Sequence, residues 1–195
     1  MCSSDLPRFG ASMAYDAATG TAVLFGGSGR HGLLNATWTW NGSTWAQQSP
    51  AARPVAQAGT VMAYDAATGT VVLFATAVRQ PPPLLPSLDS TWTWDGSTWT
   101  RQSPAASPAA RIATVMAYDA ATGTVVLFGG AGNNGTTLLG DTWAWDGSTW
   151  TRQAPATSPP ARANAAMAYD AAAGTVVLFG GNDSGGLVHD TWTWG

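Results

Sequence analysis

The chain contains no lysine and no glutamate: its eight basic residues are all arginine and its eleven acidic residues are all aspartate. Lysine and glutamate are good helix formers, whereas threonine, valine and tryptophan, which favour strands, are abundant here. The composition therefore favours an all-β fold. A net charge of −3 with only 10% charged residues creates no positive field for nucleic acid. No apolar stretch approaches the roughly 18 residues of a membrane helix, so we expect no membrane insertion.

Cysteine is almost absent as well. The only one, Cys2, excludes a disulfide framework and a cluster of thiolate metal ligands. It lies in residues 1–6, which look like the translated end of a sequencing-library adapter and resemble nothing in the rest of the chain. We therefore assign residues 1–7 to a non-native leader and residues 8–195 to the fold. The absence of a signal peptide then leaves the compartment open.

What the sequence does contain is a repeat of about 50 residues. Its first marker, Met-Ala-Tyr-Asp, occurs four times, with steps of 49, 54 and 51 residues between the tyrosines. Each copy continues through a glycine-containing turn into an apolar run such as Val125–Phe128, and then through a variable loop to Thr-Trp-Thr-Trp or Thr-Trp-Ala-Trp. All eleven tryptophans fall within this motif. The four units span about residues 8–50, 51–104, 105–155 and 156–195.

Each unit predicts four short antiparallel strands, which we name a to d in chain order. Strand a ends in Asp before a turn with Gly, and strand b is a continuous apolar run, typical of a strand covered on both faces. Strand c alternates Thr with Trp, and an Asn-Gly or Asp-Gly turn leads into strand d. Four such strands at a period of about 50 residues indicate a β-propeller blade. The fourth unit stops after strand c, at Gly195.

The order of arginine, apolar strand, Tyr-Asp turn, Val-Leu-Phe-Gly-Gly, Asp-Thr-Trp and a further tryptophan resembles the kelch repeat of galactose-oxidase-like propellers. The resemblance covers residues 8–195 and implies four blades, the last one incomplete, expected to form an open fragment of a larger propeller. The remaining blades of a parent chain would then be its partners. The second unit departs from the pattern, because Ala75 and Thr76 replace Gly-Gly, Gln57 replaces the arginine, and the loop contains Pro81–Pro83. We expect a distorted end of strand b and a stiffer loop there.

Most of the repeated residues are predicted to be structural. Tryptophans of strand c fill the space between blades, where each buries roughly 150–250 Å², and the Asp that ends strand a hydrogen-bonds its own turn. Asp141 and Asp190 are expected to cap the start of strand c. A surface that stacks on sugar rings is the alternative for the tryptophans, and Trp45, Trp99 and Trp150 of strand d suit it best. The predicted structural set is Tyr15, Tyr64, Tyr118, Tyr169, Trp38, Trp40, Trp92, Trp94, Trp143, Trp145, Gly26, Gly27, Gly129, Gly130, Gly180 and Gly181.

The candidate ligand site lies at one end of the blades. Because strand direction alternates, the b–c loops and the d–a linkers share one end, which we call the b–c face, and the residues that differ between units gather there. Three arginines open strand a at this end. They either tie a linker carbonyl to the neighbouring blade or form a ring of cations that suits a carboxylate or an acidic peptide. The candidate set is Arg8, Arg111, Arg162, Arg30, His31, Arg79, Asn133, Asn134, Asn182 and Asp183.

Two functions fit this pattern. The first is a non-catalytic binding scaffold for a protein, carboxylate or glycan ligand. The second, implied by the resemblance, is a fragment of a galactose-oxidase-like copper enzyme. A copper site needs converging histidines, tyrosines and a cysteine, whereas His31 and His189 lie in units that are not neighbours.

Calcium at Asn182–Ser184 would lack further carboxylates, and a phosphate cradle would lack a helix. We therefore expect no cofactor, no metal and no enzyme. The resemblance favours an extracellular or cell-surface location, and the composition favours a GC-rich bacterial genome.

Overall fold

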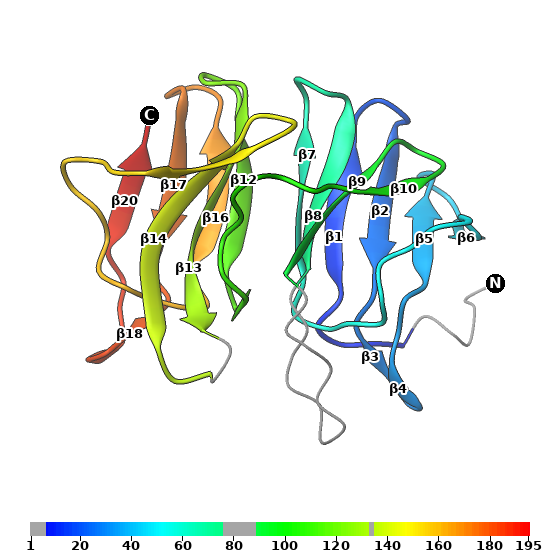
Figure 1. Cartoon of the computed structure of the whole chain (residues 1–195), viewed down its shortest axis with the longest axis horizontal. Helices are drawn as coiled ribbons and strands as arrows, with labels where there is room; N and C mark the ends of the chain where they lie inside the picture. Colours follow the sequence, from blue (N-terminus) through cyan, green and yellow to red (C-terminus); the bar gives the residue numbers. More distant parts are fainter. Residues whose placement is uncertain (1–6, 76–88, 133–134) are drawn as a thin grey trace. The chain divides into compact units, whose positions relative to one another are not determined.

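The computed structural model describes residues 7–75, 89–132 and 135–195, and every regular element in these ranges is a β-strand. Within them, no segment forms a helix that could span a membrane. Four antiparallel sheets form β-propeller blades, which confirms the predicted all-β propeller fold (Figure 1). The chain divides into two compact units, residues 1–64 with 68–103 and residues 65–67 with 104–195.

The first unit contains two four-stranded blades. Blade 1 consists of β1 (Ser12–Asp16), β2 (Thr21–Phe25), β5 (Thr37–Trp40) and β6 (Trp45–Gln48) in that spatial order. Blade 2 consists of β7 (Val61–Asp65), β8 (Thr70–Ala75), β9 (Ser90–Trp94) and β10 (Trp99–Arg101). A short hairpin of β3 (Ser28–Gly29) and β4 (Gly32–Leu33) extends from the b–c connection of blade 1.

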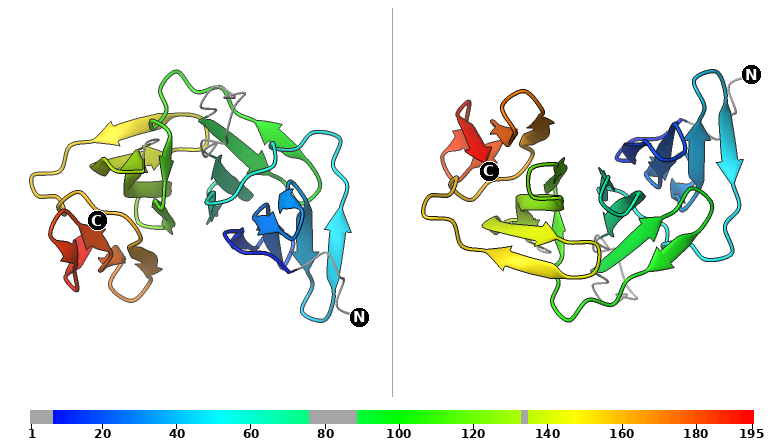
Figure 2. Two further views of the ribbon diagram at one scale, coloured as in Figure 1. Left: turned by 90° about the horizontal axis from the view of Figure 1, so that it is seen from below. Right: turned by 90° about the horizontal axis from the view of Figure 1, so that it is seen from above.

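The second unit contains blades 3 and 4. Blade 3 consists of β12 (Val115–Asp119), β13 (Thr124–Gly132), β14 (Leu138–Trp145) and β15 (Trp150–Gln153), and β11 (Arg111–Ile112) pairs with the end of β13. Blade 4 has three strands among the described residues, β16 (Ala166–Asp170), β17 (Thr175–Phe179) and β20 (Thr191–Trp194). The hairpin of β18 (Asn182–Asp183) and β19 (Gly186–Leu187) repeats the β3–β4 hairpin. The innermost strands β12 and β16 lie side by side (Figure 2).

The a–b turns form as the sequence predicts. Asp16 ends β1, and its Oδ1 accepts the backbone N–H groups of Ala18 and Thr19 at 3.0 and 3.3 Å. Asp65 accepts the N–H of Ala67 at 3.0 Å in the same way. An aspartate that satisfies turn N–H groups fixes the hairpin without any ligand, so the structural interpretation of these residues is confirmed.

The paired glycines after strand b allow backbone to approach closely. Gly26 and Gly129 have φ of +70° and +62°. A Cβ at Gly26 would lie 2.7 Å from the carbonyl oxygen of Gln57, and one at Gly129 would lie 2.6 Å from that of Arg162. These carbonyls belong to the linker that enters the next blade, so any larger residue would push the linker away.

The core of the first unit lies between its two sheets. Val23 and Phe25 of β2 face Val71 and Leu73 of β8, and all four side chains are fully buried. Strand b is buried on both faces in blades 2 and 3, as predicted from its composition, whereas Phe179 at the end of strand b in blade 4 is 52% exposed.

One repeated residue differs from the prediction. Tyr15 is 62% exposed, together with Met13 at 58%, because both lie on the face of β1 that no described residue covers. Its counterpart Tyr64 packs against the core of the first unit. The structural interpretation of Tyr15 as a packed side chain was therefore wrong.

Candidate functional site

A buried ion pair lies at the b–c end of blade 3. Arg111, which is 1% exposed, donates from Nη1 and Nη2 to the two carboxylate oxygens of Asp141 at 2.6 and 2.9 Å. Its Nε donates to the carbonyl of Ala109, and Nη1 also donates to the carbonyl of Gly129 at 3.1 Å. The Nε1 of Trp143 donates to Asp141 Oδ2 at 2.7 Å. We call this arrangement the Arg–Asp–Trp triad.

Blade 4 repeats the triad. Arg162, also 1% exposed, pairs with both oxygens of Asp190, and its Nη2 lies 2.9 Å from Oδ2. Nη1 donates to the carbonyl of Gly180 at 3.1 Å, and Trp192 Nε1 donates to Asp190 Oδ2 at 2.7 Å. In both blades a carboxylate therefore receives two guanidinium N–H groups and one indole N–H group. The carboxylate balances the charge of a buried guanidinium, which would be costly to bury alone.

The hydrogen bonds of the triads stabilise the ionised carboxylates. Burial opposes the ionisation of Asp141, but the bonds from Arg111 and Trp143 outweigh it and place the pKa of this carboxyl below its ordinary value of 3.8. The bonds from Arg162 and Trp192 lower the pKa of Asp190 in the same direction. The bond to Asp190 raises the pKa of the Arg162 guanidinium. Both carboxylates therefore stay ionised at neutral pH.

The triads correct two predictions. Arg111 and Arg162 are buried and bound to their own aspartates, so their guanidinium groups do not form a ring of cations for a ligand. The tie to a linker carbonyl is present in both cases, at Ala109 and Pro160. Asp141 and Asp190 bind an arginine and a tryptophan side chain, so they do more than cap the start of strand c.

Blade 2 replaces both charged members of the triad. Gln57 occupies the arginine position and Ser90 the aspartate position, and Trp92 Nε1 donates to Ser90 Oγ at 3.1 Å. Gln57 is 2% exposed, and neither of its amide atoms has a hydrogen-bond partner among the described residues. Its backbone still pairs with blade 1, where its N–H donates to Leu34.

Blade 1 retains the arginine and the tryptophan but not the aspartate. Arg8 Nη1 donates to the carbonyl of Gly26 at 2.9 Å, as the other two arginines do to Gly129 and Gly180. Ala36 stands where blades 3 and 4 have aspartate. The indole Nε1 of Trp38 is buried and has no acceptor in the part of the chain that the structure describes.

A cavity of about 580 Å³ opens at this position. Arg8, Ala36 and Trp38 line it together with Arg30 and His31. Arg30 and His31 are exposed and lie in the β3–β4 hairpin, which places them at the b–c end of the blade. Three of the predicted candidates, Arg8, Arg30 and His31, are thus brought together, while Ala36 and Trp38 complete the site. Sequence reasoning overlooked Ala36 and assigned Trp38 to packing alone.

The other candidates are separate from this cavity. Arg79, Asn133 and Asn134 lie outside the described residues. Asn182 Oδ1 accepts a hydrogen bond from Asn164 Nδ2 at 2.7 Å, and Asp183 Oδ1 accepts the N–H of Gly185 at 2.7 Å. Asn182 and Asp183 therefore hold the β18–β19 hairpin of blade 4, a position equivalent to the hairpin beside the cavity of blade 1.

The tryptophans of strand d are not the exposed aromatic surface that was considered as a rival site. Trp99 and Trp150 are only 2% and 1% exposed. Trp99 packs edge-on against Phe25, with ring centroids 5.5 Å apart, and its Nε1 donates to Thr37 Oγ1 at 2.9 Å. That alternative is wrong for these two residues, because both are buried. In blade 2 the tryptophan of strand d packs against the neighbouring blade 1.

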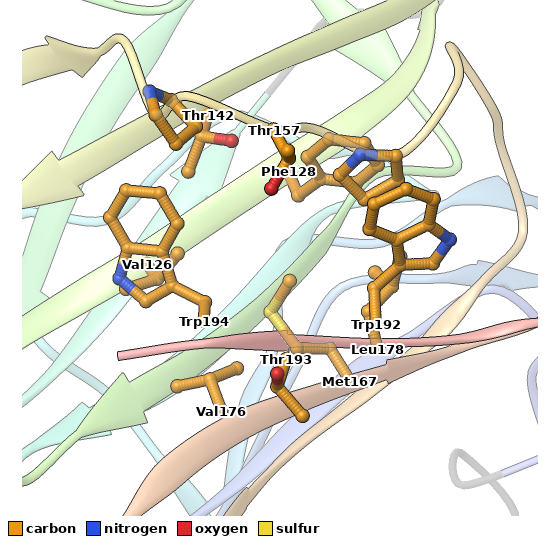
Figure 3. Close-up of a pocket in the computed structure, with 12 residues that line it drawn as sticks. Val126, Phe128, Thr142, Thr157, Met167, Val176, Leu178, Trp192, Thr193 and Trp194 are labelled. Carbon is orange, nitrogen blue, oxygen red and sulfur yellow. The ribbon is translucent and has the colours of Figure 1, made fainter.

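The second unit has a small apolar cavity of about 40 Å³ between its two blades (Figure 3). Phe128 and Thr142 of blade 3 line one side, and Met167 and Trp194 of blade 4 line another. Phe128 and Thr142 correspond to Phe25 and Thr37, which hold the indole of Trp99 in the first unit. The cavity thus lies at the position that corresponds to the packing site of Trp99 in the first unit. It is lined mainly by apolar side chains.

Comparisons with known proteins add no family. No protein-family model matches the chain, and no curated protein matches it significantly. In the described ranges, no group of three or more His, Cys, Asp or Glu side chains is placed to hold a metal ion.

Proposed function

We propose that the chain is a non-catalytic binding scaffold of the kelch type, whose ligand docks at the b–c face. The observation that carries this proposal is the cavity of blade 1, where Arg8, Arg30 and His31 come together at the end of the blade that differs most between repeats. Variable loops on a rigid scaffold are where binding proteins place their specificity. The charged lining favours an acidic peptide, a carboxylate or an acidic glycan.

A panel of immobilised probes tests the proposal. It contains capped acidic, neutral and basic peptides together with neutral and acidic oligosaccharides, and binding is followed by biolayer interferometry. We expect an acidic probe to bind, and the double variant Arg30→Ala/His31→Ala to weaken binding. Ser43→Ala, in the exposed c–d turn at the other end of blade 1, is the matched control and should bind like the unaltered chain. Equal loss in both variants would overturn the assignment of the face.

The alternative is a fragment of a galactose-oxidase-like copper enzyme, suggested by the repeat alone. The same purified protein distinguishes the two functions. Stoichiometric copper after refolding with Cu²⁺, together with oxidation of a primary alcohol, would replace the scaffold proposal.

A further inference from the structure

Blade 1 and blade 4 each expose a sheet face whose residues are buried in other blades. We infer that blade 1 of one copy of this chain packs on blade 4 of a second copy, as blade 2 packs on blade 1 within the first unit. This inference goes beyond the proposed function, because it concerns the faces of two sheets and not the ligand at the b–c face.

The contact between blades 1 and 2 is the template. Trp99 of β10 packs on Phe25 of β2, and its Nε1 donates to Thr37 Oγ1 of β5 at 2.9 Å. Phe25 and Thr37 are buried, and Met62 of β7 belongs to the same core as Phe25 and Trp99. The template therefore has two sides, a Phe–Thr face on one blade and a Met–Trp face on the next.

Blade 4 presents an uncovered Phe–Thr face. Phe179 of β17 lies directly opposite Thr191 of β20, as Phe25 lies opposite Thr37 in blade 1. Phe179 is 52% exposed and Thr191 is exposed as well, whereas the equivalent phenylalanines of the other three blades are buried. A packing position that the other blades fill thus has no cover from the described residues, and exposed apolar side chains of this kind mark an interaction surface.

Blade 1 presents an uncovered Met–Trp face. The register places Tyr15, Ala22, Trp40 and Trp45 in one row across the sheet, so their side chains lie on the same face. Tyr15 and Met13 are more than half exposed on this face, and Trp45 is only half-buried, although its counterpart in blade 2 is buried. The indole of Trp45 already packs on Trp40, with ring centroids 5.6 Å apart, as the template requires.

The two faces therefore complement each other between copies. Trp45 of one copy takes the place of Trp99 in the template, so it packs on Phe179 and donates its Nε1–H to Thr191 Oγ1 of the second copy. Burial of an indole and a phenylalanine ring supplies the driving force. Because the two faces are different surfaces of the chain, the contact is heterologous, and association proceeds head to tail.

Sedimentation velocity over a series of protein concentrations tests the inference with the full chain. We expect oligomers of the unaltered chain whose share rises with concentration. Phe179→Asp blocks the face of blade 4 and Tyr15→Asp blocks the face of blade 1, so each variant alone should stay monomeric. An equimolar mixture of the two should form a 1:1 dimer, because each variant keeps the face that the other has lost. Leu187→Asp, at a 91% exposed leucine of the β18–β19 hairpin, is the matched control and should associate like the unaltered chain.

Trp45→Phe provides a test that does not depend on the two aspartate variants. It keeps an aromatic ring but removes the indole N–H, and it should weaken association by roughly fivefold. An unaltered chain that stays monomeric at all concentrations would overturn the inference. A mixture of folded Phe179→Asp and Tyr15→Asp that stays monomeric would overturn it as well, and so would unchanged association of either variant alone. Circular dichroism of each variant confirms that it is folded.

Discussion

Blade 1 and blade 4 present the same arginine and tryptophan beside the same Gly-Gly pair, yet they differ at the position two residues before that tryptophan. In blade 4 the carboxylate of Asp190 receives Arg162 and Trp192, whereas in blade 1 Ala36 leaves a cavity beside Arg8 and Trp38. The same arginine and tryptophan positions thus form a triad with an aspartate in blade 4 and line a cavity in blade 1. The comparison shows that repeats with the same arginine and tryptophan differ in whether an aspartate of their own accepts the indole N–H.

The largest expected effect concerns the packing of Trp99 between the two blades of the first unit. Trp99→Ala removes an indole that is 2% exposed and packs on Phe25, so it should destabilise the protein by about 3–5 kcal/mol. Trp45→Ala is the matched control, because Trp45 is only half-buried and should cost less. Urea denaturation followed by circular dichroism measures both, and equal losses would show that strand d does not hold the two blades together.

The next largest effect is expected when the triad of blade 3 loses its carboxylate. Asp141→Ala leaves the buried guanidinium of Arg111 without its carboxylate, and we expect a loss of about 3 kcal/mol in the free energy of unfolding. Chemical denaturation in chloride and in acetate of equal ionic strength measures this loss. Acetate should restore part of the stability, because it can pair with the guanidinium of Arg111 that the variant leaves without its carboxylate. A loss below about 0.5 kcal/mol would show that the triad is not an important structural element.

The triads also predict a dependence of stability on pH. The folded pKa values of Asp141 and Asp190 lie below the ordinary value of 3.8, so the unfolded chain binds more protons in the window below that value. Stability should therefore be fully present above about pH 4 and fall as the pH drops below it. Asp141→Asn/Asp190→Asn should flatten this slope in denaturation curves recorded from pH 5 to pH 2. An unchanged slope would assign the acid sensitivity to other carboxyls, of which Asp95, with its pKa lowered to about 2 by its hydrogen bonds with Thr98, is the first candidate.

A smaller effect is expected when a carboxylate is added at the Ala36 position of blade 1. Ala36→Asp adds a carboxylate beside Arg8 and Trp38 and should stabilise the protein by about 1 kcal/mol, as a charge-assisted hydrogen bond to a buried donor does. Ala36→Asn is the control, since it offers an acceptor without a charge. Thermal denaturation should rank the aspartate variant above the asparagine variant and both above the unaltered chain. A destabilised aspartate variant would mean that the position in blade 1 is not equivalent to that in blade 4.

The smallest effect concerns the backbone beside the triads. Two residues after the arginine position, every blade has a left-handed residue: Gly10, Gly59, Ala113 and Asn164, with φ between 55° and 75°. Alanine is strained in this conformation, so Ala113→Gly should stabilise blade 3 by roughly 0.5 kcal/mol. Gly59→Ala, its reverse in blade 2, should destabilise by a similar amount, and both are measured by thermal denaturation. A loss of stability in Ala113→Gly would show that the side chain of Ala113 contributes packing.

The sequence predicts the fold well because the same local signals occur four times. The Tyr-Asp turns, the apolar strand b and the alternating Thr-Trp strand c each specify their own hairpin, and the structure has all of them. Packing of the last strand was harder to predict. Trp99 lies on the outermost strand of its blade, but the neighbouring blade covers it, and that contact is long-range in the sequence.

The site was predicted only in part. Arg8, Arg30 and His31 were found because they are basic residues and lie at the variable end. The roles of Arg111 and Arg162 were missed, although the sequence contained a signal. Only the third and fourth repeats combine the arginine, the Gly-Gly pair and an Asp directly before Thr-Trp, and these two repeats form the triad. Ala36 was missed because an alanine attracts attention only when it is compared with the aspartate at the same position in the other repeats.

The most direct test compares the indole N–H of Trp38 in proton–nitrogen NMR spectra of the unaltered chain and of Ala36→Asp. Trp38→Phe assigns the resonance by its disappearance. The account predicts that the Trp38 resonance of Ala36→Asp lies downfield of that in the unaltered chain, as expected for a buried donor that gains a carboxylate acceptor. A resonance at the same position in both proteins would contradict the claim that Ala36 occupies the position of Asp141 and Asp190.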